Sequence, residues 1–134
     1  MDRSENMRRI KSVDTVPEMI VRRLVRSLGY RYRLHSSDLP GKPDLAFRKR
    51  KKAILVHGCF WHQHDNAECK LSHRPKSNRG YWDEKLKRNK RRDKANLNAF
   101  HSLGWSVLVL WECETREKKG LERKIVGFLG ATRP

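Results

Sequence analysis

The side chains best suited to chemistry lie in one eight-residue run, from His57 to His64. The run holds three histidines, one cysteine and two large aromatic residues directly after an apolar segment. Imidazole and thiolate bind borderline metals, and imidazole also exchanges protons near neutral pH. The run could therefore hold a metal, transfer a proton or do both, and Phe60 and Trp61 could stack on bases. The plainer alternative is a strand end with core aromatics and ordinary surface histidines.

The cysteines are a second candidate for metal binding. The chain has three of them, and a reducing compartment would keep them as thiols or metal ligands rather than as disulfides. With one histidine they form a Cys₃His set that suits a closed tetrahedral zinc site, namely Cys59, His64, Cys69 and Cys113. The ion would pin an irregular loop over residues 66–78 to a neighbouring strand. Free buried thiols are the alternative.

Three carboxylates could complete a site. Asp44 follows Pro43 where a strand leaves a turn, and hydrated Mg²⁺ prefers one or two carboxylates together with phosphate oxygens. A simple turn role is the alternative for Asp44. Asp93 interrupts the apolar stripe of a helix and needs a partner, either an imidazole or a basic neighbour. Glu18 could join the site or could only cap its own helix.

The residues left for proton transfer are His57 and His62, and their spacing leaves open which of them acts as the base. All five candidate catalytic residues lie at element ends or on faces that converge toward the C-terminal edge of the third strand. These residues are Glu18, Asp44, His57, His62 and Asp93.

Helix caps and hydrophobic periodicity predict the elements that position these residues. Thr15, Pro17 and Glu18 mark the start of a helix over about 17–28. Apolar alternation and turn residues predict strands over 30–35, 44–47, 53–56 and 105–111, with a basic hairpin tip at 48–51. A long helix is expected over 81–101 and a last one over 121–129. This order implies an α/β fold with helices around a mixed sheet.

Charge and length limit the partners. The chain has 32 basic and 15 acidic residues and a net charge of +17, which favours a polyanion and above all nucleic acid. Residues 1–14 are predicted to form a basic arm before a single domain over 15–134. No stretch reaches the ~18 apolar residues of a membrane span, and the N-terminus lacks a signal-peptide core. We therefore expect a cytoplasmic protein with no membrane partner.

The chain resembles the very short patch repair (Vsr) DNA mismatch endonucleases over nearly its whole length. The resemblance rests on Asn6-Met7-Arg8, Pro17-Glu18, Leu39-Pro40-Gly41-Lys42-Pro43-Asp44, His57-Gly58-Cys59-Phe60-Trp61-His62, Tyr81-Trp82, Arg92-Asp93, Leu103-Gly104-Trp105 and Trp111-Glu112-Cys113. It implies a restriction-endonuclease-like core with one structural zinc. It also implies an Mg²⁺-dependent enzyme that cuts one strand 5′ to the thymine of a T·G mismatch left by deamination of 5-methylcytosine.

The same resemblance implies roles for individual residues. Asp44 and the backbone carbonyl of Val56 would bind Mg²⁺. The other candidate catalytic residues would hold metal-bound water or transfer protons, with His62 favoured as the base and Asp93 orienting it. An aromatic wedge beside the mismatch would consist of Phe60, Trp61 and Trp82. The mismatched pair itself would be contacted by Met7, Lys85 and Asn89.

Partners are likewise implied by the resemblance alone. They are double-stranded DNA with a T·G mismatch, the mismatch-repair protein MutL, and the sequence context of a cognate cytosine methyltransferase. A single cut at an asymmetric mismatch requires no two-fold symmetry, so we expect a monomer. Two rival hypotheses are a zinc-stabilised module that binds nucleic acid without cleaving it, and a zinc-structured nuclease of the His-Asn-His type.

Overall fold

A four-stranded mixed sheet forms the centre of the chain. The computed structural model describes residues 15–59, 62 and 79–130. The strand order is β1-β2-β3-β4, and the strands are β1 (Arg33–Leu34), β2 (Leu45–Phe47), β3 (Lys52–His57) and β4 (Ser106–Trp111). The first three strands pair antiparallel, and β4 pairs parallel with β3 over six residue pairs. Strand β3 is therefore held on both sides.

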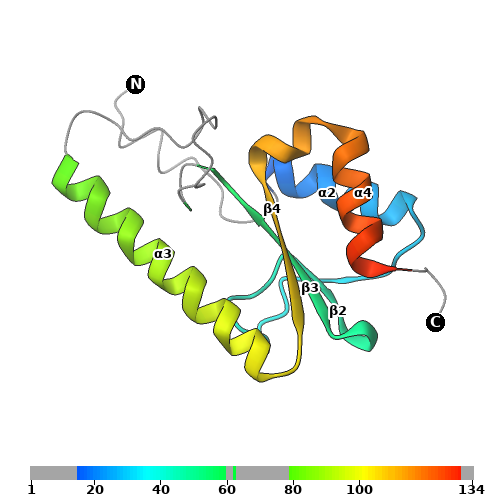
Figure 1. Cartoon of the computed structure of the whole chain (residues 1–134), viewed down its shortest axis with the longest axis horizontal. Helices are drawn as coiled ribbons and strands as arrows, with labels where there is room; N and C mark the ends of the chain where they lie inside the picture. The colour runs from blue at the N-terminus through cyan, green and yellow to red at the C-terminus, as the bar shows by residue number, and fades with distance from the viewer. Residues whose placement is uncertain (1–14, 60–61, 63–78, 131–134) are drawn as a thin grey trace.

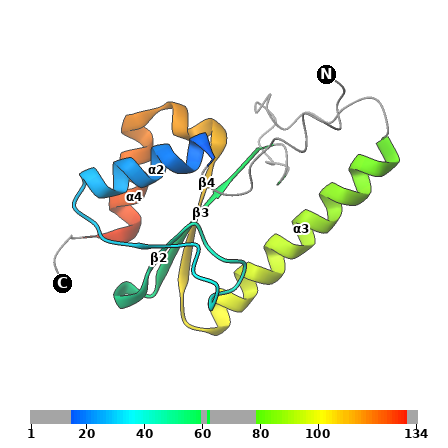
Figure 2. The ribbon, with the colours of Figure 1, turned by 180° about the vertical axis from the view of Figure 1, so that it is seen from behind.

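Three helices cover the sheet from opposite sides. Figures 1 and 2 show α2 (Val16–Ser27) and α4 (Lys118–Leu129) together on one side and α3 (Arg79–Ser102) on the other. Helix α3 lies in the crossover between the two parallel strands, as such a connection requires. The predicted mixed sheet flanked by helices is confirmed. Within the described ranges, no helix is both long and apolar enough to cross a membrane.

The hydrophobic core lies between the sheet and the pair α2 and α4. Alternate strand residues such as Leu45, Phe47 and Ile54 are buried against Val21 and other side chains of the two helices. Because side chains along a strand alternate between faces, His57 of β3 lies on the opposite face, toward α3. The end of β3 therefore carries side chains to both sides of the sheet.

Helix α2 begins as its capping residues predict. The Thr15 hydroxyl accepts a hydrogen bond from the Glu18 backbone N–H at 3.3 Å, and Pro17 occupies the first turn. Glu18 shares the buried stripe with Val21 and Val25, and only 1 % of its surface is exposed. The apolar stripe thus carries a carboxylate into the interior.

One predicted strand was too long, and one helix begins earlier than predicted. Of the strand expected over 30–35, only Arg33 and Leu34 pair, because the chain turns at His35, whose φ is +44°. Strand β4 ends at Trp111 as predicted, and a 3-10 turn, η3 (Glu112–Arg116), follows it. Helix α4 begins at Lys118 rather than near 121, since the Glu117 side chain accepts the Gly120 N–H at 2.9 Å and caps it.

The hairpin between β2 and β3 is fixed to the end of α4. Its tip is a short 3-10 turn, η1 (Arg48–Arg50), as the basic hairpin predicted. Arg50 donates to the Leu129 carbonyl at 2.8 Å, and Lys52 Nζ donates to the Phe128 carbonyl at 2.5 Å. Basic groups at a helix C-terminus satisfy its last carbonyls and complement its dipole. The start of β3 is therefore anchored, which fixes the position of its far end.

Candidate active site

Three titratable side chains meet beside the start of α2, and we call them the carboxylate cluster. Glu18 comes from the first turn of α2, His35 from the end of β1, and Asp44 from the turn before β2. One donor atom from each lies within 4.8 Å of the other two. The His35 Nε2 to Glu18 Oε2 distance is 3.0 Å, and Asp44 Oδ2 accepts the Val56 backbone N–H at 2.7 Å. This set could hold a cation.

Burial perturbs the ionisation of Asp44. The pKa of Asp44 is raised from 3.8 to about 7, chiefly by loss of hydration on burial and also by the neighbouring Glu18 carboxylate, while the Val56 N–H and His35 oppose the rise. The buried Asp44 carboxyl group therefore keeps its proton to higher pH unless a further positive charge joins it. A divalent cation would supply that charge, and oxygen donors are those that Mg²⁺ prefers.

The turn that delivers Asp44 is braced against its surroundings. Gly41 has a φ of +65°, and a Cβ there would lie 2.4 Å from Asn96 Nδ2 on α3, so the close approach requires glycine. Arg48 makes two hydrogen bonds to the Asp38 carboxylate, at 2.9 and 2.6 Å. The turn therefore packs closely onto α3 at Gly41, whereas the Asp38–Arg48 pair is exposed to solvent and should contribute little to the position of Asp44.

A second group lies on the other face of β3, and we call it the histidine cluster. It consists of His57 at the end of β3, His62, and Asp93 on α3. His62 Nδ1 lies 2.5 Å from Asp93 Oδ2. The two imidazole rings stack with centroids 3.8 Å apart and planes 9° apart, and the edge of Trp111 packs against His57. The pairing expected for Asp93 is thus made by an imidazole.

The histidine cluster is arranged for proton transfer. The pKa of His57 is lowered from 6.5 to about 4, chiefly by burial and also by the His62 charge, while Asp93 opposes the change. His57 Nδ1 has no hydrogen-bond partner among the described residues. An imidazole nitrogen binds a metal through a lone pair that lies in the ring plane. Because the two rings are stacked, their lone pairs lie in parallel planes and do not converge on one ion. With Nδ1 facing Asp93, His62 can present Nε2 to a water.

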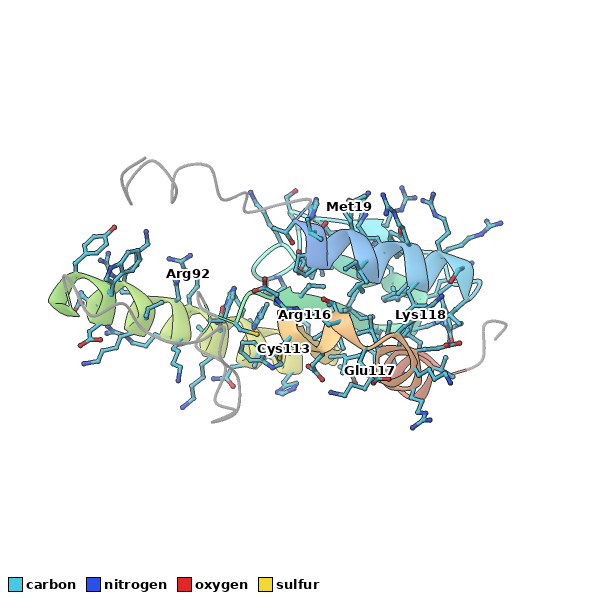
Figure 3. All side chains as sticks on the ribbon, turned by 90° about the horizontal axis from the view of Figure 1, so that it is seen from above. Met19, Arg92, Cys113, Arg116, Glu117 and Lys118 are labelled. Atoms are coloured by element: carbon cyan, nitrogen blue, oxygen red, sulfur yellow. The ribbon has the colours of Figure 1, made fainter. Side chains whose placement is uncertain are left out.

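Two of the four predicted zinc ligands lie next to each other. Cys59 is buried just after β3, and its Sγ accepts the Cys113 backbone N–H at 3.4 Å. Figure 3 shows Cys113 in η3, between α3 and the pair α2 and α4. His64 and Cys69 lie outside the described residues, as does the irregular loop expected over 66–78.

Predicted DNA contacts lie along α3. Lys85 and Asn89 are half-buried on successive turns that lead to Asp93, and Trp82 is 4 % exposed. Arg92 extends away from the helix in Figure 3. Other predicted contacts, at Met7, Phe60 and Trp61, lie outside the described residues, together with the basic arm 1–14.

The sequence patterns did not identify His35 as a member of the carboxylate cluster. They placed it only at the end of a predicted strand. Its approach to Glu18 spans 17 positions of sequence and depends on the left-handed backbone at His35 itself. A lone histidine before two serines gives no local pattern that would have identified it.

The fold and the two clusters can be set beside known proteins. The chain is 42% identical over 123 residues to the Type II nicking enzyme V.XorIIP of Xanthomonas oryzae pv. oryzae, covering 92% of this chain and 88% of that one. It is 40% identical over 116 residues to the Type II nicking enzyme V.NmeAIP of Neisseria meningitidis, with coverages of 87% and 81%.

These relatives and the basic, cluster-bearing fold define the class: this chain is an endonuclease that nicks DNA. Residues 1–68 match the family described as DNA mismatch endonuclease Vsr. The DNA mismatch endonuclease Vsr of Escherichia coli K12 is 37% identical over 119 residues, which cover 89% of this chain and 74% of that one. The chain belongs to the Vsr family.

Proposed function

We propose that this enzyme nicks one strand of duplex DNA 5′ to the thymine of a T·G mismatch, using Mg²⁺, and so starts very short patch repair of deaminated 5-methylcytosine. One observation carries the proposal most strongly. The Val56 N–H holds Asp44 in the carboxylate cluster, and the next residue, His57, belongs to the histidine cluster. Consecutive residues of one strand therefore bring a candidate cation site next to a candidate proton acceptor, the two groups that metal-assisted phosphodiester hydrolysis uses.

In this proposal Asp44 and the Val56 carbonyl hold Mg²⁺, and Glu18 holds its water ligands. The donor set fits, because it is rich in buried oxygen, and burial together with the neighbouring Glu18 carboxylate raises the pKa of Asp44 in a way that a cation would offset. Bound Mg²⁺ would polarise the scissile phosphate and supply the attacking water. The core around the site is proposed to be restriction-endonuclease-like.

His62 is proposed as the general base, and Asp93 orients it. The contact between His62 Nδ1 and Asp93 leaves Nε2 available to accept a proton, and the carboxylate stabilises the imidazolium that forms. His57 stays neutral at neutral pH because its pKa is about 4. It can therefore hold metal-bound water by a hydrogen bond without adding positive charge beside His62.

A structural zinc bound by Cys59, His64, Cys69 and Cys113 is part of the proposal. The contact between Cys59 and Cys113 supports it, since it joins the end of β3 to η3. Metal analysis of protein purified without chelator should find about one zinc ion per chain. Substantially less zinc would remove this site from the proposal.

In this proposal the mismatch is recognised by side chains on the face of α3 that leads to the active site, and by residues that precede α3 in the sequence. Phe60, Trp61 and Trp82 form the wedge, while Met7, Lys85 and Asn89 contact the mismatched pair. A wobble pair unstacks more easily than a matched one, which would favour insertion there. Trp82 is 4 % exposed in the chain without DNA, so insertion would require it to move outward.

The wider setting is proposed on the same basis. The enzyme would act as a monomer in the bacterial cytoplasm, with its basic arm on DNA and with MutL and a cognate cytosine methyltransferase as functional partners. Family membership favours this enzyme over the module that binds without cleaving and over the His-Asn-His nuclease.

A second candidate specificity arises from the two relatives named Type II nicking enzymes. In this candidate the preferred flanking sequence of the mismatch differs from one family member to another, because specificity depends on few base contacts and on the deformability of the site. The flanking context is therefore the variable to test first.

The test is a strand-resolved cleavage assay with duplexes that carry one T·G pair or its T·A counterpart in several flanking sequences. In Mg²⁺ we expect a nick 5′ to the mismatched thymine, no nick in EDTA, and a ranking of the contexts. Binding without cleavage in every context, or equal cutting of T·A, would sink the proposal. Asp38→Ala, an exposed carboxylate of the same turn, serves as the matched active control for Asp44→Ala.

A further inference from the structure

We propose that His35 is a positioning residue that holds the Glu18 carboxylate against Asp44, so that the two carboxyl groups present their oxygens to one cation. The inference rests on the proposed function, because it uses the same cation site. It concerns a residue that neither composition nor motif singled out, and it rests on two contacts of His35 and on the backbone conformation of that residue.

The side chain of His35 makes the first contact. Its Nε2 lies 3.0 Å from Glu18 Oε2, where an ionised carboxylate can only accept, so the ring N–H donates. Glu18 is 1 % exposed, and water cannot replace this donor easily. A buried carboxylate without a donor would be costly, so the ring is part of what fixes its orientation.

The backbone of the same residue makes the second contact. The His35 N–H donates to the Asp44 carbonyl at 3.5 Å, at the end of the ladder between β1 and β2. One residue therefore touches both carboxylate-bearing residues, with its main chain on Asp44 and its ring on Glu18. These two residues are 26 positions apart in the sequence, 44 − 18, and His35 ties their relative positions together.

The left-handed backbone at His35 supports this interpretation. Its φ of +44° is unusual for a residue other than glycine, although histidine and asparagine adopt it more often than most. Such a conformation costs about 1 kcal/mol or more and persists where surrounding contacts determine it. It ends β1 at the point where the ring meets α2, which is the geometry that the contact with Glu18 requires.

Arg22 does not make His35 redundant. Its Nη1 lies 3.5 Å from the same oxygen, Oε2 of Glu18, and it comes from the next turn of the same helix. A contact within one helix cannot set the position of that helix relative to β2. His35, which comes from the sheet, can do so.

Two substitutions separate the ring donor from the backbone role. His35→Asn suits a left-handed backbone but is too short to reach Glu18 from there, whereas His35→Gln keeps an N–H donor at a similar reach. His101→Asn changes an exposed histidine at the end of α3 and is the matched control. Circular dichroism and cooperative unfolding establish that each variant folds.

The first readout is the rise in melting temperature as Mg²⁺ is added to the full chain without DNA, which gives an apparent Mg²⁺ affinity. The second is the Mg²⁺ dependence of single-turnover nicking of a T·G duplex. We expect His35→Asn to raise the half-saturating Mg²⁺ concentration about tenfold in both readouts, as loss of a hydrogen bond to a charged group implies. DNA affinity in EDTA should not change, and His35→Gln should recover most of the loss.

Unchanged Mg²⁺ dependence in His35→Asn would overturn the proposal. So would a His35→Gln variant as impaired as His35→Asn, since the imidazole itself would then be required. If the wild type binds Mg²⁺ but nicks no T·G duplex, the proposed function fails and the melting readout alone decides the role of His35.

Discussion

Burial acts in opposite directions on the two clusters at the end of β3. In the carboxylate cluster it raises the pKa of Asp44 to about 7, and in the histidine cluster it lowers the pKa of His57 to about 4. Both changes oppose buried charge. In the carboxylate cluster, however, two carboxyl groups share one imidazole, that of His35, so a cation can compensate the second, whereas the histidine cluster pairs its one carboxylate with an imidazole.

This difference suits the two clusters to different chemical tasks. A group that needs an external positive charge is suited to bind a metal, and a neutral ring beside an oriented imidazole is suited to move protons. Experiments that remove one function and leave the other intact therefore test this comparison directly.

The largest effect is expected for Asp44→Ala. It should reduce nicking on the order of a thousandfold, because the cation loses its main protein ligand. The Mg²⁺-induced rise in melting temperature should disappear, while DNA binding in EDTA stays the same. Asp38→Ala should behave as wild type. Substantial nicking by Asp44→Ala would contradict the assigned cation site.

A slightly smaller effect is expected for His62→Ala. Loss of the general base should lower the single-turnover rate on the order of a hundredfold, at the lower end of what a general base contributes. The Mg²⁺-induced rise in melting temperature should remain, since His62 belongs to the other cluster. If His62→Ala abolished Mg²⁺ binding as well, the two clusters would not be separate functions.

The stability of the metal-free protein should report on Asp44. Its folded pKa of about 7 lies above the usual 3.8, so the stability from its protonated form is lost as pH rises through this window. Asp44→Asn should therefore exceed wild type by on the order of 2 kcal/mol at about pH 8, with little difference at about pH 4. Urea unfolding in EDTA measures both values. A gap independent of pH would mean that burial of the charge is not the cause.

The opposite slope is expected for His57, with the smallest effect. Its folded pKa of about 4 lies below 6.5, so the wild type loses stability as pH falls from 6.5 toward 4. His57→Phe keeps a ring against Trp111 and should flatten this slope by about 1 kcal/mol. His101→Phe, at an exposed position, should not. An unchanged slope in His57→Phe would show that His57 is not the buried neutral group.

Local patterns were sufficient to predict several parts of the site. Capping residues located the start of α2, and its apolar stripe placed Glu18 inside. The interruption of the α3 stripe at Asp93 predicted a buried polar contact, which His62 makes. Each of these depends on neighbours within a few positions, which is the range that periodicity and caps can detect.

Other parts depend on contacts that sequence spacing does not contain. His35 joins the carboxylate cluster through one backbone angle and the approach of α2 to the sheet. The early start of α4 depends on a glutamate cap before a basic first turn that has no apolar residue to mark it. A hydrophobic pattern cannot indicate either feature, since both are polar.

The hold on β3 from both sides has a mechanical consequence for the enzyme. Val56 and His57 are consecutive residues of β3, and each contacts one cluster, so the points at which the strand meets the two clusters are one peptide unit of about 3.8 Å apart. In the proposed mechanism, substitutions at Lys85 and Asn89 on α3 can alter which bases are contacted without moving these two residues. A single inserted or deleted residue within β3 would instead exchange its faces and uncouple both clusters at once. The proposed base contacts can therefore vary independently of the strand that joins the two clusters.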